Sequence, residues 1–303
     1  MVNLTYDYLL PTEADLPDSD ETPVDNQLQN DIPNLLLNIL LWLWGDRTDW
    51  FWGVDMGVYY EANIENPEAS KVIVPDGFLA LGVPRHKSEG GRLSYVLWQE
   101  QVLPILALEV ISKKYNDEYD LKLKKYQALG ILYYVIYNPF SDKASGKGVA
   151  HKRDQSLEVY KLVDGKYILM SLTSLPADSM GSSTGKMIWM PEIGLGIGCD
   201  RSLYGNWERE WLYWYDQAGS RYPTSSEKVD MAESIANRQQ LIAKRQRQIA
   251  KQERLAKQEA EFAQQQAEFA QQQAESIAIQ ERQQKEKLAA YLRSLGINPD
   301  EIP

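Results

Sequence analysis

No glycine or proline occurs between Pro223 and Gly296, and this feature constrains the fold of the chain more than any other. The tract is dominated by Gln, Ala, Glu, Lys and Arg, which are mostly strong helix formers. It predicts one long helix of about 65 residues, at roughly 1.5 Å per residue. Gly296 is its expected C-cap. We therefore divide the chain into a front domain, 1–222, a long helix, 223–295, and a short tail, 296–303.

A seven-residue repeat runs through the middle of this predicted helix. The heptad AEFAQQQ occurs twice in tandem, starting at Ala260 and at Ala267. The same spacing relates a longer series of apolar residues, namely Ile242, Ile249, Ala256, Ala263, Ala270 and Ile277. Together with Ala260, Ala267 and Ala274, this series forms the a/d seam of a coiled coil, although the seam is rich in alanine. The repeat predicts a coiled coil and a homodimer, and the alternative is a single solvated helix.

The residues before 223 mix helix and strand patterns. Helices are predicted at 26–44 and 118–130. The segments 53–62 and 72–82 are predicted as strands split by turn residues, and further strands are predicted at 92–98, 104–112 and 131–137. A hairpin is predicted at 157–172 that turns at Asp164-Gly165. The strands at 104–112 and 131–137 are apolar on both faces, which is typical of central strands. This order of elements predicts an α/β domain with a mixed sheet.

Charge and composition exclude several classes of protein. The net charge of −11 gives no global attraction to nucleic acid, so binding to DNA would need a local basic patch. Cys199 is the only cysteine, which excludes a disulfide framework and suits a reducing, cytoplasmic location. The most apolar run, 35–45, is shorter than the roughly 20 residues that span a bilayer. We expect it to be a buried helix, and we expect no membrane partner.

One acidic residue, Glu109, interrupts the apolar run at 105–111. Because a buried carboxylate is costly without compensation, a cation is expected beside it. Asp76 lies just before another apolar run, 77–81. Two acids on neighbouring strands that face one side would suit Mg²⁺, which takes oxygen ligands and keeps several waters. The alternatives are a turn hydrogen bond for Asp76 and a structural ion pair between Glu109 and a lysine.

At these residues the sequence resembles the Uma-two family of restriction-endonuclease-like proteins. The resemblance covers roughly residues 8–222 and rests on VPDGFLALG, LALEVIS, YDLKLKKYQALGILYYVIYNP and LEVYKLVDGKY, among other segments. It implies the PD-(D/E)XK nuclease fold, a central mixed sheet flanked by helices that cuts phosphodiester bonds with Mg²⁺. By this resemblance, Asp76 and Glu109 are metal ligands and catalytic residues.

The sequence departs from the pattern of that superfold at Ile111. The superfold places a lysine two residues after the glutamate, where this chain has Ile111. The resemblance points instead to Lys122 in the following helix, four residues before Tyr126, as the catalytic lysine. Lys113, just beyond the strand, is the rival donor. The family often has an aspartate four residues before that lysine, where this chain has Glu118.

The resulting expectation is a Mg²⁺-dependent endonuclease, with Mn²⁺ as a substitute, that hydrolyses DNA with a metal-activated water. Asp25, just before the first helix, is a candidate third metal ligand or the N-cap of that helix. The alternative is an inactive scaffold with a nuclease fold that uses its C-terminal helix to bind partners. A third hypothesis, a Mg²⁺-dependent phosphatase or nucleotide hydrolase, uses similar carboxylates.

Overall fold

A computed structural model of the chain describes residues 10–18, 26–87, 89–112, 118–140, 155–174 and 186–296. The chain divides into two compact units, Met1–Lys228 and Val229–Pro303. Within the described residues, every strand belongs to the first unit. The second unit contains most of one long helix.

A six-stranded sheet lies at the centre of the first unit, in the order β1-β4-β6-β7-β8-β9. The strands are β1 Trp50–Val54, β4 Gly77–Leu81, β6 Leu106–Val110, β7 Tyr133–Tyr137, β8 Leu157–Val163 and β9 Lys166–Leu169. All neighbours are antiparallel except β6 and β7, which are parallel. Every residue of β6 and β7 is buried, as expected for central strands. The mixed α/β fold class predicted from the sequence is therefore confirmed.

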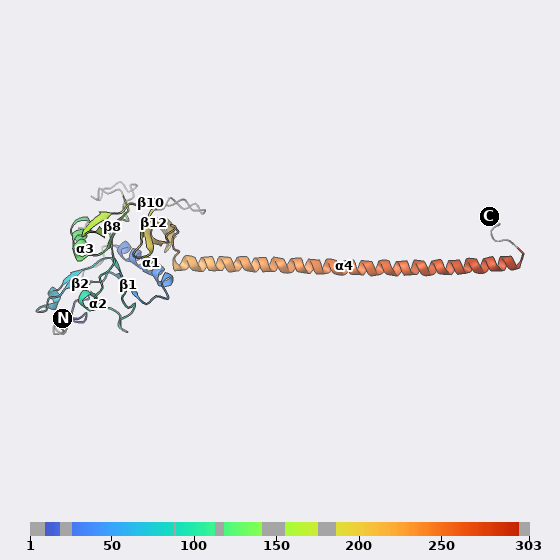
Figure 1. Cartoon of the computed structure of the whole chain (residues 1–303), viewed down its shortest axis with the longest axis horizontal. Coiled ribbons are helices and arrows are strands. Elements are labelled where there is room, and N and C mark those ends of the chain that lie inside the picture. Colours follow the sequence, from blue (N-terminus) through green and yellow to red (C-terminus); the bar gives the residue numbers. More distant parts are fainter. Residues whose placement is uncertain are drawn as a thin grey trace. The chain divides into compact units, whose positions relative to one another are not determined.

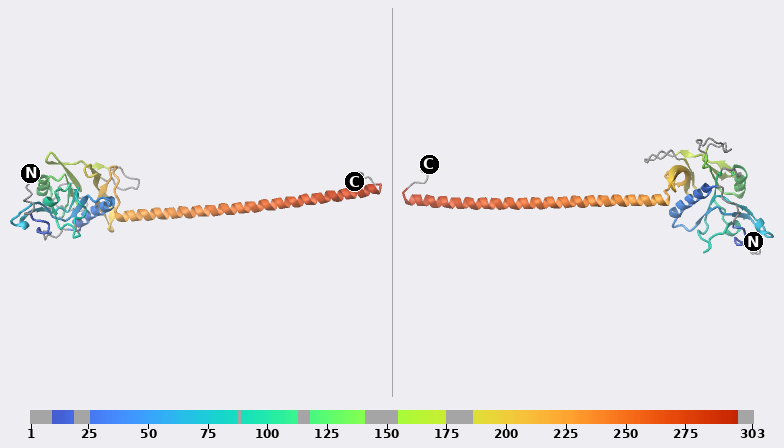
Figure 2. Two further views of the ribbon diagram at one scale, coloured as in Figure 1. Left: turned by 60° about the horizontal axis from the view of Figure 1, so that its bottom comes forward. Right: turned by 180° about the vertical axis from the view of Figure 1, so that it is seen from behind.

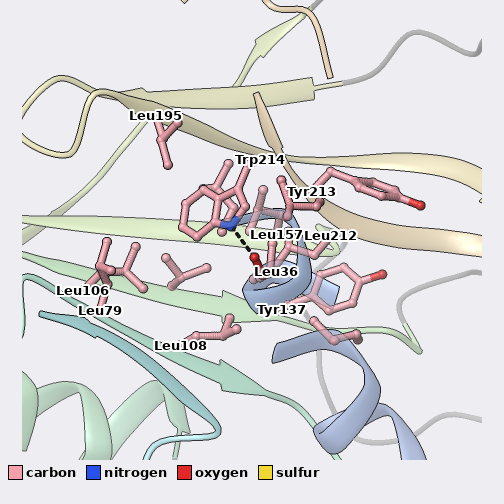
Figure 3. Close-up of a cluster of buried hydrophobic side chains, with 14 of the residues drawn as sticks. Leu36, Leu79, Leu106, Leu108, Tyr137, Leu157, Leu195, Leu212, Tyr213 and Trp214 are labelled. Atoms are coloured by element: carbon pink, nitrogen blue, oxygen red, sulfur yellow. Dashed lines mark hydrogen bonds between the residues drawn. The ribbon is translucent and has the colours of Figure 1, made fainter. Parts of the chain in front are cut away.

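Helix α1 (Gln27–Leu43) and a second sheet cover one face of the central sheet. That sheet has the order β10-β11-β12-β13, with β10 Thr173–Ser174, β11 Lys186–Met190, β12 Leu195–Tyr204 and β13 Trp207–Tyr215. Figure 3 shows Leu36 of α1 and Trp214 of β13 packed with leucines of the central sheet. The Trp214 indole N–H donates a 3.1 Å hydrogen bond to the Leu36 carbonyl, so the polar atom of this large buried ring is satisfied.

The other face of the central sheet packs against helix α3 (Leu123–Leu129) and a small third sheet. The small sheet has the order β3-β2-β5, with β2 Val58–Glu61, β3 Lys71–Ile73 and β5 Tyr95–Val96. A π-helical turn, η2 (Glu118–Lys122), leads directly into α3. Two short helical turns, η1 (Pro67–Ala69) and α2 (Leu97–Glu100), complete this side. This face carries the acids that the sequence singles out.

Local backbone geometry explains where the predicted elements differ from the observed ones. The predicted strand at 92–98 is a strand only at Tyr95–Val96, because α2 follows and ends at Gln101, whose φ of 55° is left-handed. The segment 53–62, predicted as strand split by turn residues, is divided between β1 and β2 near Asp55, whose φ is 47°. The predicted hairpin is confirmed: Asp164 and Gly165 have φ of 48° and 76°, as a type I′ turn requires.

The predicted long helix is confirmed as α4, Ser225–Ser294, which continues without a break in every view (Figures 1 and 2). A capping box begins it: the Glu227 N–H donates to Thr224 Oγ1, and the Thr224 N–H donates to Glu227 Oε2 at 2.7 Å. Gly296 follows its end with a left-handed φ of 84°. None of the α4 residues is buried. No helix in the described ranges is both long and apolar enough to cross a bilayer.

Candidate active site

The two acids predicted from the sequence meet on the α3 side of the central sheet, where β4 and β6 run antiparallel. Asp76 immediately precedes β4, whose first residue, Gly77, pairs with Leu108 of β6. The Val110 amide N–H donates a 2.6 Å hydrogen bond to Asp76 Oδ2. The carboxylate of Asp76 is therefore held beside the end of β6 that carries Glu109.

Glu109 accepts hydrogen bonds from two donors in the helical segment that follows β6. Its side chain is almost fully buried, with 1% of the residue exposed. Lys122 Nζ donates to Glu109 Oε2 at 2.7 Å, and the Tyr126 hydroxyl donates to Oε1 at 2.6 Å. Lys122 and Tyr126 are four residues apart, so they share one face of the helical segment. The structure thus brings Asp76, Glu109 and Lys122 together, and their catalytic roles stay predictions.

Ile111 explains why the strand itself does not supply the ammonium. Side chains two residues apart on a strand point to the same face, so Ile111 lies on the side of Glu109. It is completely buried in an apolar cluster with Tyr126 and Tyr134. An ammonium at this position would be surrounded by hydrocarbon and aromatic rings. Lys122 reaches Glu109 from the helical side instead, with 22% of its side chain still exposed.

Burial and mutual repulsion shift the pKa values of the clustered acids and of Lys122. Burial raises the pKa of Asp76 well above its ordinary value, and the nearby Glu109 carboxylate raises it further. Burial also raises the pKa of Glu109, although Lys122 and Tyr126 oppose this effect. Burial lowers the pKa of Lys122, but the hydrogen bond and charge of Glu109, together with the charges of Asp76 and Glu118, outweigh burial, and the pKa is raised overall. One ammonium therefore balances the carboxylates only in part.

Two further acids add negative charge near the pair. Glu118, the first residue of η2, is buried, and its charge raises the pKa of Glu109. Asp55, at the end of β1, raises the pKa of Asp76. The sequence identified Glu118 only as the counterpart of a family aspartate, and Asp55 was not singled out. Its position at the end of a strand that pairs with β4 was the available signal.

Tyr126, like Asp55, is a site residue that sequence reasoning missed. Its ring is completely buried and lies 4.8 Å from the ring of Tyr134, centroid to centroid. Tyr134 in turn stacks on Tyr160 and Tyr167 at 6.4 and 6.0 Å. A buried tyrosine next to other aromatics looks like ordinary core in a sequence. Its spacing of four residues from Lys122 was the signal that could have linked it to Glu109.

The donor set fits a hard cation that needs few protein ligands. Each oxygen of Glu109 accepts one of the two hydrogen bonds described above and keeps a further lone pair, and Asp76 supplies a second carboxylate. Mg²⁺ is commonly held by one or two carboxylates and several waters. In the part of the chain that the structure describes, no three His, Cys, Asp or Glu side chains gather as a metal-binding group. The fit is therefore to a cation held by two carboxylates.

The remaining candidates lie outside the described residues. Asp25, the candidate third metal ligand, and Lys113, the rival to Lys122, are both in segments that the structure does not describe. The N-cap of α1 is Asn26, whose side chain accepts a 2.9 Å hydrogen bond from the Leu28 N–H. The capping role considered for Asp25 therefore belongs to its neighbour.

Fold and site together define a mixed α/β protein with an acid pair and a lysine on one face of its central sheet. A family model, Uma2, described as "Putative restriction endonuclease", matches residues 20–189, more than half of the chain. The chain belongs to this family. Comparisons with curated proteins and with solved structures gave no significant match. The matched region contains Asp76, Glu109 and Lys122 and ends before α4.

Replacement of Tyr126 by phenylalanine is expected to lower the free energy of unfolding by about 1.5–3 kcal/mol, the usual cost of losing a hydrogen bond to a charged group. Urea denaturation measures the change. The matched control is Tyr95→Phe, because Tyr95 is also fully buried but donates to a neutral carbonyl, that of Val102, at 2.7 Å. That variant should lose only about 1 kcal/mol. Equal losses would contradict a charged acceptor at Glu109.

Proposed function

We propose that this protein is a Mg²⁺-dependent endonuclease that hydrolyses phosphodiester bonds of DNA. The observation that carries the proposal is the convergence of Asp76, Glu109 and Lys122 on one face of the central sheet. Membership of a restriction-endonuclease-like family supports DNA as the partner. The same three residues, without that membership, would suit other phosphoryl hydrolases equally well.

Each residue has a distinct role in this proposal. Asp76 and Glu109 hold the metal, and Tyr126 fixes one Glu109 oxygen by its hydrogen bond. A bound Mg²⁺ would polarise the phosphate and lower the pKa of a water. Lys122, which stays charged, orients the attacking water and offsets the charge that develops on the phosphate oxygens. Hydrolysis is direct, with no covalent intermediate on the protein.

A second candidate function is a non-catalytic scaffold that keeps the nuclease fold. Two observations favour it: Ile111 stands where the superfold has its lysine, and the net charge of −11 opposes contact with a polyanion. In a scaffold the Glu109–Lys122 contact would be a structural ion pair. The two candidates differ in one measurable respect, because only the nuclease needs a metal bound by Asp76 and Glu109.

Calorimetric titration with Mg²⁺ and Mn²⁺ tests the proposed metal site. The wild type is expected to bind one ion, and Asp76→Asn none. Because the pKa of Asp76 is raised, protons compete with the metal, and affinity should fall as the pH is lowered from about 8 toward the ordinary aspartate pKa of about 4. The metal-free wild type should also lose stability relative to Asp76→Asn as the pH rises from about 4, since the native state binds this proton more tightly than the unfolded state.

The control for this titration is Asp200→Asn. Asp200 is a partly buried aspartate, 3.1 Å from Arg221, which also pairs with Glu227 and so keeps one partner in the variant. This variant should bind Mg²⁺ as the wild type does. Metal binding that survives Asp76→Asn, or a wild type that binds no metal, would remove the basis of the nuclease and favour the scaffold.

A further inference from the structure

Helix α4 carries an apolar stripe along its surface. None of its residues, all of which the structure describes, is buried, and the four isoleucines of the stripe keep 47–58% of their surface exposed. In heptad notation, the d positions are Ile235, Ile242, Ile249, Ala256, Ala263, Ala270, Ile277, Gln284 and Tyr291. The a positions are Gln239, Gln246, Glu253, Ala260, Ala267, Ala274, Glu281 and Leu288. The repeat keeps one phase over this whole length, which is the pattern of a coiled-coil strand.

Charge is segregated along the same helix. The stretch 238–257, called the basic block here, contains seven basic residues and one acid, a net charge of +6. The next stretch of equal length, 259–278, called the acidic block, contains four acids and no basic residue, a net charge of −4. Residue 258 lies between them. Two copies of the helix related by a two-fold axis at residue 258 would place each basic block beside the acidic block of the other copy.

We propose that α4 pairs with α4 of a second copy of this chain as an antiparallel coiled coil centred on residue 258. In this register each a position faces a d position of the partner, as antiparallel packing requires. Ile249 faces the partner's Ala267, and Ile242 faces the partner's Ala274. In the successive layers at 242, 246, 249 and 253, a larger side chain meets an alanine of the partner, so the two helices can keep a uniform separation over these layers.

A parallel, in-register pair is worse on three counts. Isoleucine would face isoleucine at 235, 242 and 249, and then alanine would face alanine in six successive layers from 256 to 274, so the separation of the helices would have to change midway. Glu253 would face the partner's Glu253 in the seam, whereas in the antiparallel register it faces the partner's Ala263. The two basic blocks would also lie side by side and repel each other.

Disulfide trapping in the full chain tests the orientation. In a Cys199→Ser background, Ile249→Cys and Ala267→Cys are prepared separately and are then oxidised alone and as a mixture. The antiparallel register predicts a 249–267 disulfide in the mixture and no cross-linked product from either variant alone. The two copies of residue 249 would be about 27 Å apart along the axis, beyond the reach of a disulfide. Gln265→Cys, on the outer face, is the control and should not cross-link.

Sedimentation equilibrium tests the association itself. The wild type should have the mass of a dimer at tens of micromolar, and Ile242→Lys/Ile249→Lys should have half that mass, because both lysines enter the seam. The matched control, Gln265→Lys/Gln272→Lys, adds the same charge to the outer face and should remain a dimer. Circular dichroism confirms that α4 stays helical in each variant. A monomeric wild type, or disulfides formed by Ile249→Cys alone, would overturn the proposal.

Discussion

Replacement of Glu109 by glutamine is expected to abolish Mg²⁺-dependent cleavage of DNA while the fold is retained. Glutamine keeps the size of the side chain, and its amide oxygen can accept from Lys122 while its amide nitrogen donates to the Tyr126 hydroxyl, but it removes one of the two charged metal ligands. Loss of several kcal/mol of metal-derived stabilisation corresponds to a fall in rate of about 10³-fold or more. The measurement is cleavage of a circular DNA substrate with Mg²⁺, with RNA and nucleotides as parallel substrates.

Glu100→Gln is the control for this result. Glu100 is also a glutamate in an ion pair, 3.0 Å from Arg92, and its side chain is only 5% exposed, but it belongs to α2 and not to the proposed site. It should therefore cut at the rate of the wild type. Cleavage by Glu109→Gln at the wild-type rate would show that the acid in β6 has no part in catalysis. Hydrolysis of nucleotides but not of DNA would point to the phosphatase hypothesis.

Replacement of Lys122 by methionine separates a catalytic lysine from a structural one. Without metal, the variant leaves the buried Glu109 carboxylate without its ammonium and should lose about 2–4 kcal/mol of stability, toward the lower end of values for buried pairs because Lys122 is partly exposed. Saturating Mg²⁺ should stabilise the variant more than the wild type, because the ion supplies the missing positive charge. Cleavage per folded molecule should nevertheless fall by about 10²-fold.

The matched control for this lysine is Lys161→Met. Lys161 in β8 also pairs with a glutamate, Glu192, at 2.6 Å, and its side chain is similarly exposed, at 27%. This variant should show neither the extra stabilisation by Mg²⁺ nor the fall in cleavage. If Lys122→Met is destabilised but cleaves DNA normally once folded, Lys122 is a structural partner of Glu109, and another group must orient the attacking water.

The parts of the fold that could be predicted from the sequence are those in which a residue pattern follows directly from burial. The strands at 104–112 and 131–137 are apolar on both faces because both faces are covered, and every residue of β6 and β7 is buried. β12 was not predicted, because Gly196 and Gly198 give it the composition of a loop. The structure explains these glycines: a Cβ on Gly198 would lie 2.5 Å from the Lys186 carbonyl oxygen of β11. Such a close approach of two backbones depends on tertiary structure, so the local sequence does not reveal it.

The candidate site could be predicted only where the local sequence itself carries the signal. Glu109 stands out because an acid in an apolar strand is costly, and that cost is a local property of the sequence. Tyr126 does not stand out, because its partner, Glu109, is 17 residues away in the sequence and its ring packs like any core aromatic. Asp76 was identifiable, but its hydrogen bond to Val110 depends on the antiparallel register of β4 and β6, which no local pattern fixes.

The geometry of this site depends on the number of residues in the π-helical turn η2. A π-helical turn holds one residue more than an α-helical turn in the same stretch of axis. Deleting one residue within it, such as the exposed Leu121, would leave Lys122 and Tyr126 in phase with each other, since both follow the deletion. Glu118, which precedes it, would turn by about 100° relative to them. A single insertion or deletion in this turn can therefore move the Glu118 carboxylate toward or away from Lys122 and Tyr126, without any substitution.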